Sequence, residues 1–315
     1  MFDEVQELWR YRELLFSMVQ RDLKIRYKNS FLGFLWSLLN PLVTVATMTV
    51  VFQFILGNTT PNLGAYIFAA YLPYMFFQLC LLDSSQTILL NIQLIKKIYF
   101  PREILPLASA ISNFIHFLFG LLVLFLFLIV VYAAFPAPNG SRIWPFHSGI
   151  VLLPLLLIMS FCLATGFSFL ISAANTFYED VKYIVAVLLY LMFFLCPIMY
   201  FSEKVYYSDL NSAHAWFYRL YHLNPIATLC TAYRKAILDP QPVQVGEQVV
   251  KVLDKYEMVK GKNIPVFKDT IVPVLKPAIG MDWKYVAIAF VVSVAVLLIG
   301  YSTFNRVKWR FVERP

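Results

Sequence analysis

Long apolar stretches alternate with short polar segments along the whole chain. A helix needs about 20 consecutive apolar residues to cross a bilayer, and several of these stretches reach that length. The pattern therefore predicts an all-α membrane protein with six transmembrane helices. We expect the spans at residues 31–56, 63–90, 105–135, 150–172, 183–201 and 285–304. The pair Asn40-Pro41 predicts a kink or local unwinding within the first of them.

A different pattern precedes the first span. Between residues 3 and 28, apolar positions recur at helical spacing and basic positions fall on the opposite side, which is typical of an amphipathic helix lying in the membrane interface. The expected apolar side holds Val5, Leu8, Trp9, Phe16, Val19 and Leu23. We therefore divide the chain into an interfacial helix (1–30), a transmembrane domain (31–304) and a short basic tail (305–315).

The longest hydrophilic region, residues 202–284, separates the fifth and sixth spans. Its first part, 203–238, is rich in aromatic residues, and the apolar run 226–238 is too short to span, so it is either re-entrant or interfacial. The second part, about 239–280, is polar, Lys-rich and punctuated by proline. It predicts a small insert or a mobile loop outside the membrane.

Composition and charge agree with a membrane protein and orient it. The chain is 60% hydrophobic and only 14% charged, and its net charge is +8. Basic residues concentrate in the segments 1–30, 91–103 and 305–315, whereas the connection 57–62 has none. The positive-inside rule therefore predicts that both termini are cytoplasmic and that the long loop lies outside. This distribution makes nucleic-acid binding a poor explanation of the charge.

The sequence lacks the residues of a self-contained pump or enzyme. No G-x-x-x-x-G-K-[ST] phosphate loop is present, and the nearest fragment, 261–263, lacks its spacing. Asp83 and His116 are the clear ionisable residues within the spans, which is a poor basis for a proton relay. The four cysteines form no metal-binding spacing. We thus expect no catalytic residue, metal or cofactor on this chain, and a stripe of small residues at 164, 168 and 172 predicts close helix packing.

Two segments on the predicted cytoplasmic side are the most informative. The first, before and within span one, contains Arg21, Asp22, Lys24, Arg26, Tyr27, Ser30, Gly33 and Trp36. The second, between spans two and three, contains Asn91, Leu94, Lys96, Lys97, Tyr99, Phe100, Pro101, Arg102 and Glu103. Its pattern predicts a short amphipathic helix that presents its lysines to water. Such a helix is a suitable contact site for a cytoplasmic partner that acts on the membrane domain.

These two segments resemble the permease subunits of type-2 ABC exporters of polysaccharides, the O-antigen, capsule and teichoic acid exporters. The run from Arg21 to Trp36, the Phe-Pro-Arg-Glu stretch at 100–103 and the segment from His222 to Arg234 carry the resemblance, which extends over nearly the whole chain. The insert at 239–280 and the acidic pair Glu179-Asp180 depart from the family pattern.

The resemblance implies a two-component machine in the bacterial inner membrane. Two copies of this chain would bind two copies of a separate ATP-binding subunit, which holds ATP and Mg and acts on a coupling helix at about 91–101. A lipid-linked glycan would then pass between the two permeases, and sugar rings would stack on aromatic side chains. The candidate channel residues are Trp36, Tyr71, Tyr74, Phe76 and Phe77. The segment 203–238 would form re-entrant helices that gate the exit.

Two alternatives remain open. A permease of the same architecture could export drugs or another lipid. A membrane-embedded glycosyl or acyl transferase would need clustered acids or a His/Asp constellation at one membrane face. The outside loop has Asp209, His214, His222 and Asp239, but at no recognisable spacing.

Overall fold

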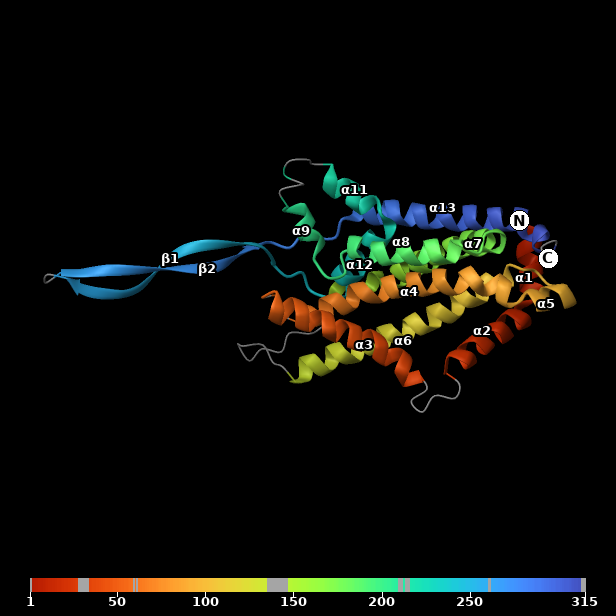
Figure 1. Ribbon diagram of the computed structural model, residues 1–315, viewed down its shortest axis with the longest axis horizontal. Helices are drawn as coiled ribbons and strands as arrows, with labels where there is room; N and C mark the ends of the chain where they lie inside the picture. The colour runs from red at the N-terminus through yellow and green to blue at the C-terminus, as the bar shows by residue number, and fades with distance from the viewer. Residues whose placement is uncertain are drawn as a thin grey trace.

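The computed structural model describes residues 2–27, 34–58, 60, 62–134, 147–208, 212, 216–259 and 262–312. It is a helical bundle with a β-hairpin projecting from one end (Figure 1). The long helices are α3 (Phe34–Val50), α4 (Leu63–Leu90), α6 (Ile104–Ala134), α7 (Leu153–Phe177), α8 (Val181–Leu195) and α13 (Trp283–Val307). Both ends of the described chain and the short helix α5 (Ile92–Lys97) lie at the end opposite the hairpin.

Within the described residues, four helical segments are long and apolar enough to cross a membrane: 63–90, 104–133, 148–177 and 283–311. Each lies at a predicted span, and the mostly helical membrane class is confirmed. At the other two predicted spans the structure has shorter apolar helices, 39–55 and 181–195. The 148–177 segment begins with the 3-10 turn η2 (Ser148–Leu152) ahead of α7.

Local chemistry explains why the two shorter helices differ from prediction. Helix α8 ends at Leu195 rather than at residue 201, because Cys196 precedes Pro197 and takes an extended conformation (ψ 148°). In the first span, Pro41 lies inside a continuous α3. The helix changes geometry later, in the π-helical turn η1 (Val51–Ile55).

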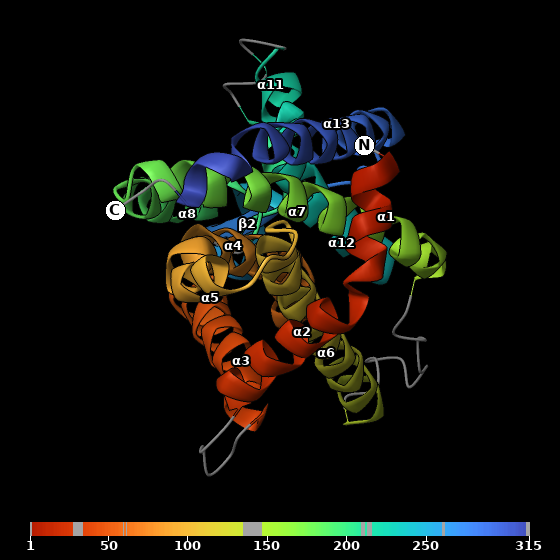
Figure 2. The same cartoon turned by 90° about the vertical axis from the view of Figure 1, so that its right-hand side faces the viewer.

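The N-terminal helix is divided in two, α1 (Phe2–Arg10) and α2 (Arg12–Tyr27), rather than continuous over 3–28. Helix α2 packs against α6 and buries Met18 and Val19. The predicted apolar side is therefore only partly correct, since Trp9 and Phe16 are each 70% exposed. Figure 2, viewed onto this end, shows α1 and α2 in front of the bundle.

The polar insert forms strands β1 (Val243–Val259) and β2 (Lys262–Lys276), which pair antiparallel. Of the two expectations, a small insert or a mobile loop, the structure agrees with the insert, and it adds a β element to a fold class predicted as all-α. Two bulges in β1, at 244/246 and 253/255, shift its register against β2. Three short helices lie near the base of the hairpin: α9 (Ser202–Tyr206), α11 (Phe217–Leu223) and α12 (Pro225–Ile237).

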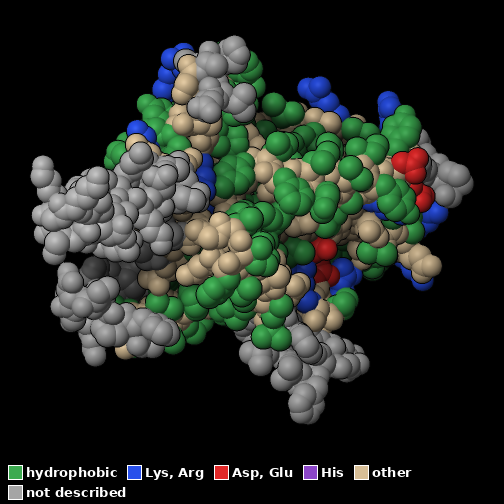
Figure 3. All heavy atoms as spheres, turned by 60° about the vertical axis from the view of Figure 1, so that its left-hand side comes forward, with side chains coloured by type: hydrophobic (Ala, Val, Ile, Leu, Met, Phe, Trp, Pro, Cys, Tyr) green, Lys and Arg blue, Asp and Glu red, His purple; other side chains and the backbone are tan. Residues whose placement is uncertain are grey.

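The core has two parts. The larger surrounds α4, which contacts α3, α6, α7, α8 and α12. The smaller lies at the end that holds α5 and joins residues of α2, α4, α5, α6, α7 and α13 through Met18, Ile88, Ile95, Ile104, Phe169 and Phe304. The flank of the bundle remains apolar outside, as Figure 3 shows and as a membrane protein requires.

Candidate functional site

The segment between α4 and α6 forms a short helix held to the bundle by its apolar residues. Helix α4 ends at Leu90, Asn91 turns the chain, and α5 covers 92–97, shorter than the expected 91–101. Ile95 and Phe100 are buried in the smaller core, while Lys96, Lys97 and Tyr99 are exposed. The segment therefore exposes basic and aromatic side chains to solvent, while Ile95 and Phe100 anchor it to the bundle.

Helix α2 brings the first predicted motif to this segment. Arg21 Nη1 donates to Asn91 Oδ1 at 2.9 Å, and Arg21 also pairs with Asp22 at 2.9 Å. Asn91 Nδ2 in turn donates to the Thr87 carbonyl at the end of α4. Two motifs that lie 70 residues apart in sequence are thus directly connected.

A second polar cluster lies one turn farther along α2. Arg26 Nη2 donates to Asp83 Oδ2 and to Asn113 Oδ1, both at 2.8 Å, and Asn113 Nδ2 donates to Asp83 at 2.9 Å. The cluster joins α2, α4 and α6. It gives Asp83 structural partners in Arg26 and Asn113.

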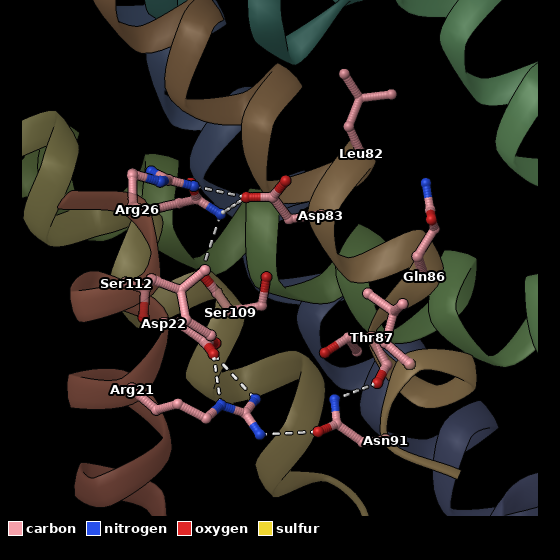
Figure 4. A pocket seen from close by; sticks show the side chains of 13 residues that line it. Arg21, Asp22, Arg26, Leu82, Asp83, Gln86, Thr87, Asn91, Ser109 and Ser112 are labelled. Carbon is pink, nitrogen blue, oxygen red and sulfur yellow. Dashed lines mark hydrogen bonds and ion pairs between the residues drawn. The ribbon is translucent and has the colours of Figure 1, made fainter. Parts of the chain in front are cut away.

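These two clusters line one cavity of about 560 Å³ (Figure 4). Its charged side chains are Arg21, Asp22, Arg26 and Asp83, two of each sign. Each arginine contacts an acid, so the charges of these four side chains balance. Lys24 is exposed, Ser30 and Gly33 lie outside the described residues, and of Tyr27 and Trp36 only the backbone is described.

The Phe-Pro-Arg-Glu stretch connects the same segment to the last helix. Glu103, 1% exposed, precedes α6 and receives Lys308 Nζ at 2.5 Å. Arg102 donates to the Lys308 carbonyl. Lys308 follows α13 and begins the 3-10 turn η3 (Lys308–Val312).

Three of the five candidate channel aromatics are buried in the described structure. Tyr74, Phe76 and Phe77 are buried within the larger core, where Phe76 stacks on Phe117 at 5.1 Å and Tyr74 donates to the Leu189 carbonyl. In this arrangement no sugar can stack on them. Tyr71 is half-buried against Phe193.

At the hairpin end, Arg234 of α12 holds several carbonyls together. Its guanidinium donates to the carbonyls of Tyr66, Pro197, Ile198 and Tyr200. Next to it, Lys235 pairs with buried Glu203 at 3.0 Å. Arg234 had no predicted role. The signal that could have identified it is a cation that interrupts the short apolar run 226–238.

Comparison with known proteins supplies the functional context. The model of the ABC-2 type transporter family matches residues 13–238, which extend from α2 to the end of α12. The O-antigen export system permease protein RfbA of Myxococcus xanthus is 31% identical over 230 residues, covering 73% of this chain and 82% of that protein. A protein of the same name from Klebsiella pneumoniae is 25% identical over 301 residues, covering 96% and 94%.

Proposed function

Since the chain belongs to the ABC-2 type transporter family, as the permease subunit of an ABC exporter, we propose that it moves lipid-linked polysaccharide across the bacterial inner membrane. The proposed cargo is of O-antigen, capsule or teichoic-acid type. Support comes from relatives named as O-antigen export permeases, two of which align with 96% of the chain.

The observation that carries the mechanism is the connection of α5 to α2 through Arg21 and Asn91. In the proposed exporter, ATP-driven closure of two separate ATP-binding subunits pushes on α5. Ile95 and Phe100 fix α5 to the smaller core, so the displacement reaches the bundle. ATP and Mg are bound by the partner subunits, and two copies of this chain form the path for the glycan.

The proposal includes six crossings with both termini in the cytoplasm. It requires 39–55 and 181–195 to cross as well as the four longer segments. Both ends of the described chain lie at one end of the bundle, as an even number of crossings requires. The helices α9, α11 and α12 would then form the re-entrant layer on the outside.

Two other functions fit less well. Export of drugs or another lipid would use the same architecture but has no support among the named relatives. A transferase would need convergent acids and histidines. Instead, Asp239 pairs with His147 and His222 is buried among tyrosines, while Asp209 and His214 lie outside the described residues.

The test is a clean deletion in the native host, complemented by the wild-type gene. We expect surface polysaccharide to disappear and undecaprenyl-linked glycan to accumulate on the inner leaflet. Co-purification of an ATP-binding subunit with the tagged chain completes the prediction. Normal surface glycan in the deletion strain, with a changed lipid or drug-resistance profile, would favour the second function instead.

A further inference from the structure

The turn η3 presents one exposed aromatic residue from a firmly anchored base. Phe311 is fully buried, with its ring 5.4 Å from Phe304 and 5.8 Å from Phe177. Lys308 is buried against Glu103. Between these anchors Trp309 is 59% exposed. A large apolar side chain held outward by two buried neighbours on its own turn is not explained by packing within the chain.

Two cations hold the Trp309 ring in place. The Arg102 guanidinium lies 5.8 Å and the Lys308 ammonium 5.4 Å from its centre. Such contacts stabilise one orientation of the indole and reduce the entropy that a binding partner would otherwise have to remove. Arg102 is also close to Glu103 and Tyr99. Burial lowers the pKa of Arg102, and these two neighbours raise it.

The ion pair between Glu103 and Lys308 is favoured by the dipoles of the two helices that it joins. Glu103 lies at the N-terminal end of α6 and Lys308 at the C-terminal end of α13, where the helix dipoles favour an anion and a cation respectively. The pair therefore fixes η3 to the segment that follows α5. The two pieces of chain, 205 residues apart, form one continuous surface.

The charged residues of these two pieces of chain are basic, and the exposed acidic pair Glu179-Asp180 lies next to them, just after Phe177, which contacts Phe311. Residues 92–102 and 305–312 contain Lys96, Lys97, Arg102, Arg306, Lys308 and Arg310 and no acid. Apart from Lys308 and the half-buried Arg102, these cations are exposed, as are Ile98 and Tyr99. A basic rim around exposed Trp and Tyr is the composition of a protein-binding hot spot.

We propose that η3 and the coupling segment form one composite docking surface for the ATP-binding subunit, with Trp309 inserted into an apolar groove that has an acidic rim. The inference rests on the proposed coupling of α5 to that subunit, but not on the identity of the exported cargo. It assigns to the end of α13 a role that the segment 91–103 was expected to fill alone.

The experiment measures binding of the purified ATP-binding subunit to the full-length permease in nanodiscs of neutral phosphatidylcholine. Trp309→Ala should weaken the affinity about tenfold or more, as expected for a hot-spot residue. Trp283→Ala is the matched control, because Trp283 begins the same helix, is 57% exposed and lies at the opposite end. It should leave the affinity unchanged. Equal melting temperatures would show that both variants fold.

A Trp309→Cys variant carrying a photo-crosslinker gives the second measurement. We expect an adduct with the ATP-binding subunit, formed on assembly and absent from the same variant at position 283. The opposing possibility is an interfacial anchor for anionic lipid headgroups. Unchanged affinity in neutral nanodiscs, with the adduct formed on lipid alone, would overturn the proposal. Because neither measurement uses the glycan, failure here is distinct from failure of the proposed cargo.

Discussion

The guanidinium of Arg21 and the side-chain amide of Asn91 are joined by a hydrogen bond of 2.9 Å, although they belong to different sequence motifs. Arg21 lies on the N-terminal helix α2, and Asn91 is the residue from which α5 begins. The bond makes the interfacial helix part of whatever movement α5 undergoes. The two motifs are therefore best understood as one mechanical unit.

Removing this bond should uncouple transport from ATP hydrolysis. Arg21→Gln loses this partly exposed hydrogen bond, worth about 1 kcal/mol, together with the ion pair to Asp22, and we expect glycan export to fall roughly fivefold while ATP turnover persists. Both rates can be measured with the assembled exporter in proteoliposomes. Arg12→Gln is the control, since Arg12 is exposed and contacts Trp9 on α1. Equal losses of export in the two variants would contradict the role of the bond.

Helix positions were largely predictable because the bilayer leaves a long apolar segment few alternatives to a helix. The face of each helix was less predictable. Helix α4 is apolar on all sides over residues 63–77, so nothing in its periodicity distinguished buried Tyr74 and Phe76 from channel residues. The spacing of apolar residues at the N-terminus placed Phe16 on the buried side, but spacing alone does not show which side of a helix meets the bundle, and Phe16 is exposed.

Contacts between residues far apart in the sequence could not be predicted from local sequence patterns. Glu103 stood out only as part of its motif and Lys308 not at all, and only the folded chain brings the start of α6 and the end of α13 together as a buried ion pair. The hairpin was missed because valines at adjacent positions, such as 249 and 250, interrupt the strict alternation that signals a strand. In contrast, the stripe at Ala164, Ser168 and Ser172 is buried as expected.

Close packing of α7 and α13 depends on two glycines. A Cβ at Gly166 would lie 2.6 Å from the backbone nitrogen of Leu297, and one at Gly300 would meet the Gly166 carbonyl. We expect Gly166→Ala to lower the free energy of unfolding by about 1–2 kcal/mol, because overpacking outweighs the gain in helix propensity. Thermal unfolding in detergent measures the loss.

Gly120→Ala is the matched control for that substitution. There the added Cβ would meet the end of the Leu72 side chain at 2.8 Å, and a side chain can turn away where a backbone cannot. We expect a neutral or slightly stabilising effect. If both variants lost stability equally, the contact between α7 and α13 would not be the cause.

His222 should make the outer helices sensitive to acid. It is buried, and burial lowers the pKa of its imidazole below the ordinary value of 6.5. The facing groups are Tyr218, Tyr221, Tyr285, Asp282, Glu203 and Lys235. The folded protein therefore keeps His222 neutral, and as pH falls below about 6.5 the unfolded chain takes up the proton first, so stability is lost.

The measurement is the melting temperature of the permease between about pH 7.5 and 5.5. His222→Gln should flatten the acid side of that profile. The matched control is His147→Gln, because His147 is one-third exposed and contacts Asp239 rather than the tyrosines around His222. An unchanged slope in the His222 variant would assign the acid sensitivity to other groups.

The hairpin should be dispensable for folding of the membrane domain. The family match ends at residue 238, before β1 begins, and the paired strands extend roughly 50 Å from the bundle at about 3.4 Å per residue. Where the hairpin meets the bundle, Val243 is buried and Tyr207 donates to the Pro277 carbonyl. Replacing residues 244–275 with a short Gly/Ser linker keeps both positions. We expect the free energy of unfolding to change by less than about 0.5 kcal/mol, and the ATP-binding subunit to bind as before.

Export in the native host would then isolate the role of the hairpin. A loss of surface glycan from a stable, assembled variant places that role after ATP-driven coupling. A variant that melts early or fails to assemble would instead make the hairpin part of the fold.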